Sequence, residues 1–466
     1  VTRRDTTVRS YDGRTMPAEL IRVSVPEARS RRNRAITVAA LRIPTVAKNP
    51  GRPVVFLMGG PGVPGTAMAP IPPYFTLFVR LRELAEVIII DQRGLGHSEP
   101  AIDCPVEAAP PIDLFLRQGR FVEMIGNRVA SCVSQMRERG IDPTAYNTIE
   151  SADDIDDLRK AIGAERIDLL AFSYGSRLAL MYVQRHGEHV GRIVLQGVSG
   201  PGLVVKRPAP VARKLDRIAA VLKQDSAWRG PTDLRAAARA ARKRLANKPA
   251  TVSITDRSTG KEINISIGRE GLDALVALNL DDLRIPALLF SVAAKDDRVL
   301  TRFADAVWNG MARGTAGLMA RAVNCAADRP DTRWRMVMAE SVQAPFGAPI
   351  DNEFLTNVFC RRVGYVAPPV EFARPVISTA PLLLLTGDLD ATNPIENARE
   401  VARGFSNVVS LEVANAAHEL LPLSAVQDVV IDWFRETDVS GRRVVAPLPR
   451  FSSIENAAIP IPQRTR

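Results

Sequence analysis

The sequence predicts an α/β protein with an open, mostly parallel sheet flanked by helices. Short continuous apolar runs recur along the chain, for example at residues 54–58 and 87–90, as expected of strands buried on both faces. Stretches with helical periodicity separate these runs. The alternation stops near Pro201 and resumes after Ser378, which predicts an inserted unit. With 466 residues, the chain is long enough for one large domain with such an insertion.

The strands of this sheet come from both ends of the chain. Residues 1–34 are polar and carry weak strand signals, whereas residues 36–43 alternate in polarity as a strand does. The two apolar runs that follow each empty into a glycine-rich loop. We expect further strands at residues 54–58, 87–90, 167–171, 192–195, 382–386 and 408–413.

The helix with the clearest ends is expected at residues 152–162. Ser151 and Asp154 have the spacing of a capping box, and Gly163 is a typical helix end. Acidic residues gather at the positive N-terminal end of this helix, and basic residues lie near its negative end. Helix-end electrostatics explains the acidic cluster, so we assign it no metal site and no chemistry.

The middle of the chain predicts a mainly helical cap inserted into the sheet domain. Helical patterns lie at residues 211–222, 233–247 and 298–312, and a hairpin is expected at residues 251–267. The tail after Pro447 is rich in proline and is expected to run over the surface. The predicted division is 1–200 for the first part of the sheet domain, 201–378 for the cap and 379–466 for the second part of the sheet domain.

The composition is that of an ordinary globular protein, with 46% hydrophobic and 24% charged residues. No apolar run approaches the length that spans a bilayer, so we expect no membrane partner. The net charge of +11 would suit nucleic acid. We reject that partner, because the basic residues are scattered and aromatic residues, at 5%, supply few stacking platforms. A solvated basic face that biases the protein toward anionic substrates or surfaces explains the charge better.

Four cysteines allow two disulfides, with Cys104 and Cys132 as one local pair and Cys325 and Cys360 as the other. Four buried thiols are the alternative. We favour disulfides, because the first pair lies in polar, loop-flanked surroundings, and hence an extracytoplasmic location over a cytoplasmic one. The chain begins at Val1, which fits removal of a leader. It has no Cys-x-x-Cys and its histidines lack zinc spacing, so we expect no metal.

One serine lies on a predicted sharp turn between a strand and a helix. Phe172-Ser173-Tyr174-Gly175 follows the apolar run 167–171 and precedes a helical pattern. A serine in that position is the nucleophile elbow of the α/β-hydrolase fold, whose strained backbone requires small residues two positions before and after it. Gly175 meets this requirement, and Ala171 departs from the usual glycine by one methyl group. Ser-x-Gly strings also occur in ordinary turns, so the assignment depends on partner residues.

An elbow serine needs a base, and the base needs an orienting acid. In α/β-hydrolases they follow in the order serine, acid, histidine. His418 is the only histidine after the cap, and it follows a predicted strand at the carboxyl edge of the sheet. We expect it to be the base. His97, in a glycine-rich turn, is a weaker rival, and His186 and His189 fall at the far end of the helix that follows the serine.

Two aspartates compete for the acid in the turn after residues 382–386. We favour Asp390 over Asp388, because Asp390 lies deeper in the turn, whereas Asp388 suits a turn cap. The oxyanion of the reaction needs backbone N–H donors, which we expect from Tyr174 and from Gly60. A plain tight turn is the alternative for the loop around Gly60, and the missing Lys-Ser/Thr pair disfavours phosphate binding there. This chemistry needs no cofactor.

With these residues assembled, the chain resembles the proline-iminopeptidase and tripeptidyl-aminopeptidase family of serine exopeptidases, especially its secreted bacterial branch. The resemblance covers most of residues 50–200 and 380–420. It rests on Gly59-Gly60-Pro61-Gly62, Asp91-Gln92-Arg93-Gly94-x-Gly96-x-Ser98, Asp103-Cys104-Pro105, the helix before Gly163, Phe172-Ser173-Tyr174-Gly175, and Gly387-x-x-Asp390 with His418. It implies Ser173, Asp390 and His418 as the catalytic triad and a disulfide between Cys104 and Cys132.

The resemblance is looser in the cap. Met338-Ala339-Glu340 is similar to the family's Cys-Ala-Glu string, whose glutamate helps to hold the free α-amine of the substrate. The resemblance therefore implies Glu340 as an amine anchor, and a surface carboxylate without that role is the alternative. Met338 replaces the cysteine of that string, so its usual disulfide is absent and Cys325 is left to pair with Cys360.

The sequence thus predicts an exopeptidase that cleaves near the free N-terminus of short peptides through an acyl-enzyme. The sequence departs from the family at Met58, Ala171 and Met338. These departures bear on the identity of the substrate more than on the type of reaction. The nearest rival is an esterase, lactonase or amidase for a small molecule. An anionic pocket around Glu340 would favour the peptidase, and an all-apolar pocket would favour the rival. The order of the triad argues against a non-catalytic binding protein of the same fold. The sequence predicts no oligomeric state.

Overall fold

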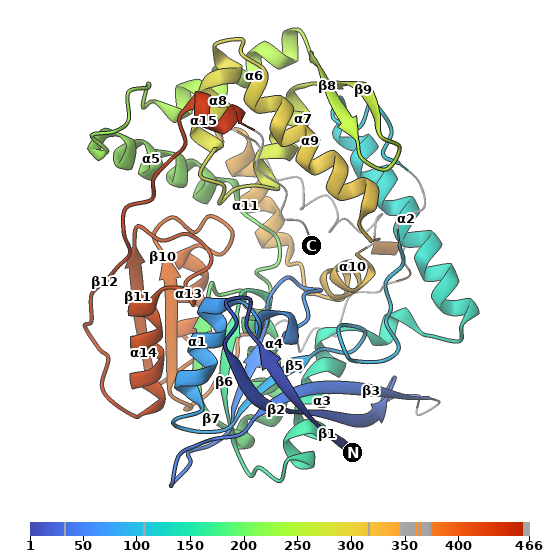
Figure 1. Cartoon of the computed structure of the whole chain (residues 1–466), viewed down its shortest axis with the longest axis vertical. Helices are drawn as coiled ribbons and strands as arrows, with labels where there is room; N and C mark the ends of the chain where they lie inside the picture. Colours follow the sequence, from blue (N-terminus) through green and yellow to red (C-terminus); the bar gives the residue numbers. More distant parts are fainter. Residues whose placement is uncertain are drawn as a thin grey trace.

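One large sheet organises the lower part of the molecule in Figure 1. The computed structural model describes residues 1–31, 34–105, 109–315, 317–344, 346, 360–361, 364, 372 and 374–459. Within these residues the sheet has ten strands, in the order β1-β2-β3-β5-β4-β6-β7-β10-β11-β12. The strands are β1 (Thr2–Arg9), β2 (Thr15–Pro26), β3 (Ala35–Ile43), β4 (Val54–Leu57), β5 (Val87–Asp91), β6 (Ile167–Phe172), β7 (Val190–Gln196), β10 (Leu382–Gly387), β11 (Val408–Ala414) and β12 (Val444–Val445).

The sheet is parallel from β5 to β12 and antiparallel from β1 to β3, with β3 antiparallel to β5. Each strand predicted from an apolar or alternating run is present, which confirms the fold class. The polar N-terminal stretch forms two long strands, although its signals are weak. The reason is that β1 is an edge strand with almost every side chain exposed, so its sequence lacks an apolar run.

Helices cover both faces of the sheet. On one face, α1 (Pro72–Leu81) and α14 (Ser424–Phe434) share an apolar cluster with the strands. The fully buried Phe56 of β4 makes edge-on contacts there with Tyr74 and Phe78, at ring-centroid distances of 6.0 and 5.3 Å. Each such aromatic pair contributes about 1 kcal/mol of stability beyond that from the apolar area it buries. The opposite face packs against α3 (Thr148–Ala161), α4 (Tyr174–His186) and α13 (Ile395–Ala402).

The capping box predicted at Ser151 is wrong. Helix α3 begins earlier, and its N-cap is Asn147, whose side chain accepts a hydrogen bond from the Glu150 amide at 3.0 Å. The acidic residues of α3 mainly form ion pairs with arginines from other segments. The fully buried Arg93 donates two 2.7 Å hydrogen bonds to Asp154, which ties the glycine-rich loop after β5 to this helix.

Between β7 and β10 the chain forms the upper part of Figure 1, which is mainly helical. Its elements are α5 (Pro208–Gln224), α6 (Leu234–Asn247), β8 (Ala250–Asp256), β9 (Lys261–Ile267), α7 (Arg269–Ala277), α8 (Ile285–Ala293), α9 (Arg298–Arg313), α10 (Leu318–Cys325) and α11 (Asp331–Ser341). The proline-rich tail returns to this part of the molecule. Its helix α15 (Ile454–Ala458) packs on α8 and α9 because Ala457 is fully buried there.

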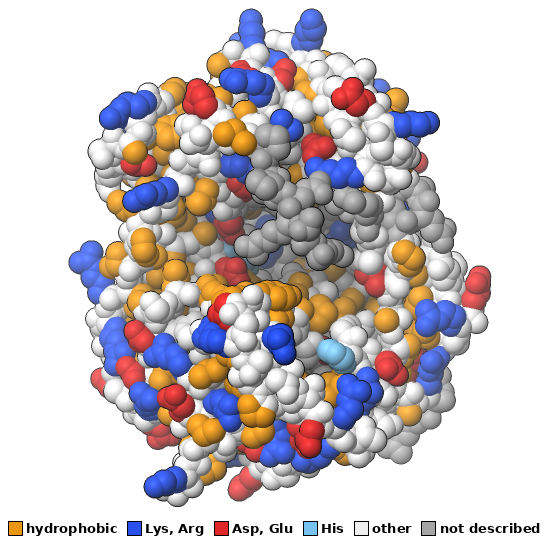
Figure 2. Space-filling model, in the orientation of Figure 1, with side chains coloured by type: hydrophobic (Ala, Val, Ile, Leu, Met, Phe, Trp, Pro, Cys, Tyr) orange, Lys and Arg blue, Asp and Glu red, His pale blue; other side chains and the backbone are white. Residues whose placement is uncertain are grey.

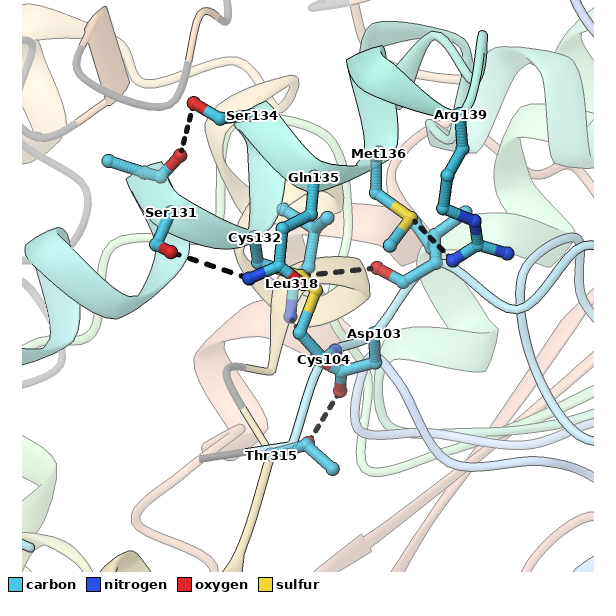
Figure 3. The surroundings of a disulfide bond; sticks show 12 residues. Asp103, Cys104, Ser131, Cys132, Ser134, Gln135, Met136, Arg139, Thr315 and Leu318 are labelled. Carbon is cyan, nitrogen blue, oxygen red and sulfur yellow. Dashed lines mark hydrogen bonds between the residues drawn. A yellow bond between two sulfur atoms is a disulfide. The ribbon is translucent and has the colours of Figure 1, made fainter. Parts of the chain in front are cut away.

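Two disulfides are present, Cys104–Cys132 and Cys325–Cys360, and no cysteine is free. The first joins the segment after β5 to α2 (Gln118–Glu138). Asp103, beside this disulfide, accepts hydrogen bonds from Thr315 Oγ1 at 2.5 Å and from the Leu318 amide at 3.2 Å (Figure 3). Asp103 therefore caps α10 from a distant part of the sequence, and the second disulfide holds the other end of α10.

Charged residues of both signs are interspersed on the face of the molecule shown in Figure 2. In the part of the chain that the structure describes, no helix combines the length and apolar character needed to cross a bilayer. The same residues contain no group of three or more His, Cys, Asp or Glu side chains arranged to hold a metal ion.

Candidate active site

Ser173 lies on a sharp turn between β6 and α4, with backbone angles φ 55° and ψ −120°. This strained conformation is held because the Ser173 amide donates to the Gln196 carbonyl at 2.8 Å. Only glycine fits at position 175, because an added Cβ atom would lie 2.0 Å from the Leu57 carbonyl oxygen. The methyl group of Ala171 is fully buried in β6, so the departure from the usual motif is accommodated.

The structure brings the predicted serine, histidine and aspartate into one hydrogen-bonded row. His418 Nε2 lies 2.9 Å from Ser173 Oγ, and His418 Nδ1 lies 2.8 Å from Asp390 Oδ2. The other oxygen of Asp390 accepts hydrogen bonds from the amides of Thr392 at 2.9 Å and Asn393 at 2.8 Å. These bonds fix the carboxylate, so that it accepts from Nδ1–H and leaves Nε2 to accept the serine proton.

The residues that competed for the roles of acid and base interact with other partners. Asp388 accepts a 2.9 Å hydrogen bond from Arg217, so the turn after β10 presents Asp390 to the imidazole, as predicted. His97 Nδ1 lies 3.1 Å from Asp91, and His186 Nε2 lies 2.8 Å from Asp153. Both are engaged away from Ser173.

Two residues at the end of β7 position the imidazole, and sequence reasoning missed them. The Gln196 side chain donates to the His418 carbonyl and accepts from the Leu420 amide at 3.3 Å. Gly197 has φ +60°, and a Cβ atom there would lie 2.8 Å from His418 Cε1. The sequence did offer a signal for Gln196. It is a polar residue at the end of a buried strand, at the same edge of the sheet as the turn that carries Ser173.

Asn393 is a further residue that the sequence did not single out. Its buried amide donates to the Gly197 carbonyl at 2.8 Å and lies 3.5 Å from Ser173 Oγ. Its oxygen accepts a 2.8 Å hydrogen bond from Lys206 Nζ. Asn393 thus links the turn that carries Asp390 to the serine and to the start of the inserted segment.

The two predicted oxyanion donors border the same space as the serine. Gly60, Ser173 and Tyr174 line one cavity, and Tyr174 is the first residue of α4, where helix amides lack intrahelical partners. A Cβ atom on Gly59 would lie 2.8 Å from Ser173 Cβ, so the glycine-rich loop passes directly beside the serine. Backbone donors at this place can stabilise negative charge on a substrate oxygen.

This cavity has a volume of about 150 Å³, which is room for a group the size of a side chain. Its described lining residues are Gly60, Pro61, Ser173, Tyr174, Arg177, Ser199, Val204, Lys206, Arg321, Asn324, Thr392 and Asn393. None of these described residues is acidic, and three of them are basic. The pocket next to the serine is therefore neither anionic nor wholly apolar.

Glu340 is not among the described residues that line this cavity. Its carboxylate accepts hydrogen bonds from Arg207, one of them at 2.8 Å, and from the Ala209 amide at 3.1 Å. These contacts hold α11 to the start of α5 and already neutralise the carboxylate. The geometry therefore gives no support to Glu340 as the anchor for a substrate amine.

Comparison with known proteins places this architecture in a family. A family model described as the alpha/beta hydrolase fold matches residues 52–425. The chain belongs to the α/β-hydrolase fold family. A solved proline iminopeptidase from Mycobacterium smegmatis shares 15% identity, with coverage of 89% of this chain and 98% of that chain and a TM-score of 0.39.

The curated relatives include serine peptidases. The chain is 30% identical over 175 residues to serine protease Hip1 of Mycobacterium tuberculosis. The matched region covers 35% of this chain and 32% of that protein. It is 28% identical over 157 residues to a tripeptidyl aminopeptidase of Streptomyces coelicolor, which covers 32% of this chain and 28% of that protein. These matches confirm the resemblance drawn from the sequence, although each spans only about a third of the relative.

Proposed function

We propose that this α/β-hydrolase is a serine exopeptidase that cleaves amide bonds near the free N-terminus of short peptides. The observation that carries its chemistry is the row of hydrogen bonds from Ser173 through His418 to Asp390. The peptidase assignment is supported by the serine protease and the tripeptidyl aminopeptidase among its relatives. The small cavity beside Ser173, bordered by α10 of the proposed cap, suits short substrates.

The proposed reaction has two halves. Ser173 Oγ attacks the substrate carbonyl carbon while its proton passes to His418 Nε2, and the oxyanion accepts hydrogen bonds from the Gly60 and Tyr174 amides. The C–N bond then breaks, and the leaving amine takes the proton from His418. Water attacks the resulting acyl-serine, gives its proton to His418, and the acid leaves as the proton returns to Ser173 Oγ. Asp390 stabilises the imidazolium in both halves.

A second candidate is an amidase or esterase that acts on a small molecule through the same residues. The observation that favours it is the lining of the cavity, which offers no carboxylate to a substrate amine among the described residues. The engagement of Glu340 by Arg207 points the same way.

A substrate panel on the wild-type protein and Ser173→Ala tests the proposal. The panel holds aminoacyl and tripeptidyl 4-nitroanilides with a free N-terminus, their N-acetylated counterparts and simple 4-nitrophenyl esters. We expect the wild type to cleave free anilides faster than acetylated ones, and Ser173→Ala to cleave none. Hydrolysis of the esters without any of the anilides would refute the peptidase and leave the second candidate.

We also propose that the protein works outside the cytoplasm. Two disulfides and no free cysteine support that location, because such bonds persist in oxidising compartments. Its proposed partner is a small peptide or acyl substrate rather than nucleic acid or a membrane.

A further inference from the structure

Arg177 is a buried cation in the wall of the cavity beside Ser173. It lies in the first turn of α4 and is only 7% exposed. One of its terminal nitrogens donates to Asn324 Oδ1 at 3.1 Å, and its guanidinium carbon lies 4.8 Å from the centre of the Tyr174 ring. Its Nε atom is buried and has no hydrogen-bond partner in the part of the chain that the structure describes. Among the described residues, the guanidinium thus meets an amide and an aromatic face, but no carboxylate.

This placement is costly for the folded protein. An arginine stays charged, and a buried charge normally has a counter-ion. Arg93 illustrates the rule, because it is fully buried and forms two hydrogen bonds with Asp154. Burial lowers the pKa of Arg177, and the Tyr174 hydroxyl opposes this effect. A cation in the first turn of a helix also faces the positive end of the helix dipole.

The surroundings of Arg177 add positive charge close to the serine. Lys206 and Arg321 line the same cavity. Lys206 donates a hydrogen bond to the side-chain oxygen of Asn393, whose amide nitrogen lies close to Ser173 Oγ. Asp328 lines a small adjoining cavity together with Arg177, and no ion pair joins these two described residues. The walls of the cavity therefore suit an anionic group and repel an ammonium group.

We infer that Arg177 binds a carboxylate of the substrate, so that the enzyme selects substrates with a carboxylate close to the bond it cleaves. The planar fork of arginine matches the two oxygens of that group. The inference rests on the proposed serine-hydrolase function and names its substrate class. In a short peptide the carboxylate is an acidic side chain on the acyl side of the bond or the C-terminal carboxylate on the leaving side. A free α-amine has to lie outside this cavity.

Two pairs of esters test the inference and distinguish the two sides. The acyl-side pair is the mono-4-nitrophenyl ester of glutaric acid and 4-nitrophenyl pentanoate. The leaving-side pair is 4-acetoxybenzoate and its methyl ester. With rates normalised to alkaline hydrolysis, we expect the wild-type kcat/KM to favour the charged ester by about tenfold or more in one pair, as one charge-assisted hydrogen bond allows.

Variants separate binding from folding. Arg177→Met is expected to abolish the preference, so that the normalised kcat/KM values of the charged and the neutral ester become equal within this variant. Arg333→Met is the matched control, because Arg333 is also a buried arginine but lies outside this cavity and donates to the Val205 carbonyl. It should keep the preference. Equal rates within both pairs for the wild type, or a preference that survives in Arg177→Met, would overturn the inference.

A binding measurement reads the subsite without turnover. Glutarate or 4-hydroxybenzoate at millimolar concentration should raise the thermal midpoint of Ser173→Ala, and the Ser173→Ala/Arg177→Met protein should show no such shift. If neither acid stabilises Ser173→Ala, the inference fails whatever the esters do. Carboxylate selectivity without any peptide hydrolysis would refute the exopeptidase and keep the subsite. Peptide hydrolysis without carboxylate selectivity would refute the subsite and keep the exopeptidase.

Discussion

The imidazole of His418 lies against Gly197, where an added Cβ atom would come within 2.8 Å of Cε1. Gly197→Ala should therefore push the ring away from Ser173 and lower kcat for an activated ester by about 100-fold or more, as misplaced catalytic groups do. Gly163→Ala is the matched control, because Gly163 also has a positive φ but no atom within 4 Å of the added group. Both variants should lose about 1 kcal/mol of stability from backbone strain. A wild-type kcat in Gly197→Ala would show that the ring is not confined there.

The turn after β10 offers its own matched pair of aspartates. Asp390→Asn removes the carboxylate that holds His418 Nδ1–H, and we expect kcat to fall by roughly 10³- to 10⁴-fold with little change in KM. Asp388→Asn alters a carboxylate that pairs with Arg217, and it should cost less than about tenfold. Kinetics on one ester compares the two. An equal loss in both variants would contradict the assignment of the acid.

The fold and the central residues could be predicted because their signals are local. Buried strands appear as apolar runs. Once the turn at Ser173 is recognised, chain order selects His418 and the turn after residues 382–386, and depth in that turn favours Asp390 over Asp388. The structure then supplies what chain order cannot, namely which atoms of these residues meet.

The supporting residues could not be predicted, since they act through contacts between distant positions. Arg177 meets Asn324 across 147 positions, and Lys206 meets Asn393 across 187. The capping box is wrong for a local reason, because Asn147 already caps the helix and Ser151 lies inside it. The role implied for Glu340 depended on a short string in the cap, and its partner Arg207 lies 133 positions away.

Reduction of the disulfides should change both the mass and the stability of the protein. The bonds close loops of 28 and 35 residues, for which loop entropy predicts about 3 to 4 kcal/mol of stabilisation each. We expect reductant under denaturing conditions to add the mass of four hydrogens, two for each bond, and reductant under native conditions to lower the thermal midpoint by several degrees. An unchanged mass would mean four free thiols and would contradict the proposed extracytoplasmic location.

Asp153 should make stability depend on acid pH. Burial raises the pKa of its carboxyl, but hydrogen bonds from His186 and Arg185 outweigh this effect and lower the pKa to about 2. Since the folded pKa lies below the unfolded value, about 2 kcal/mol of stability is present above pH ~4 and is lost as the pH falls toward 2.

The thermal midpoint of Asp153→Asn measured from pH 7 down to pH 3 checks this dependence. The deficit relative to wild type should be largest at pH 7 and should shrink as the pH falls. Asp428→Asn, which removes an exposed partner of Arg80, should cost less than about 1 kcal/mol. A deficit of Asp153→Asn that does not change with pH would contradict the lowered pKa.

The central claim is that Ser173 is a nucleophile activated by His418. Labelling with a fluorophosphonate probe, followed by intact mass and peptide mapping, tests it most directly, because the probe reacts with an activated serine whatever the natural substrate is. We predict one adduct per chain, on Ser173, that is absent from Ser173→Ala and from heat-denatured protein. A folded wild-type protein that takes no label, or an adduct that persists in Ser173→Ala, would contradict the claim.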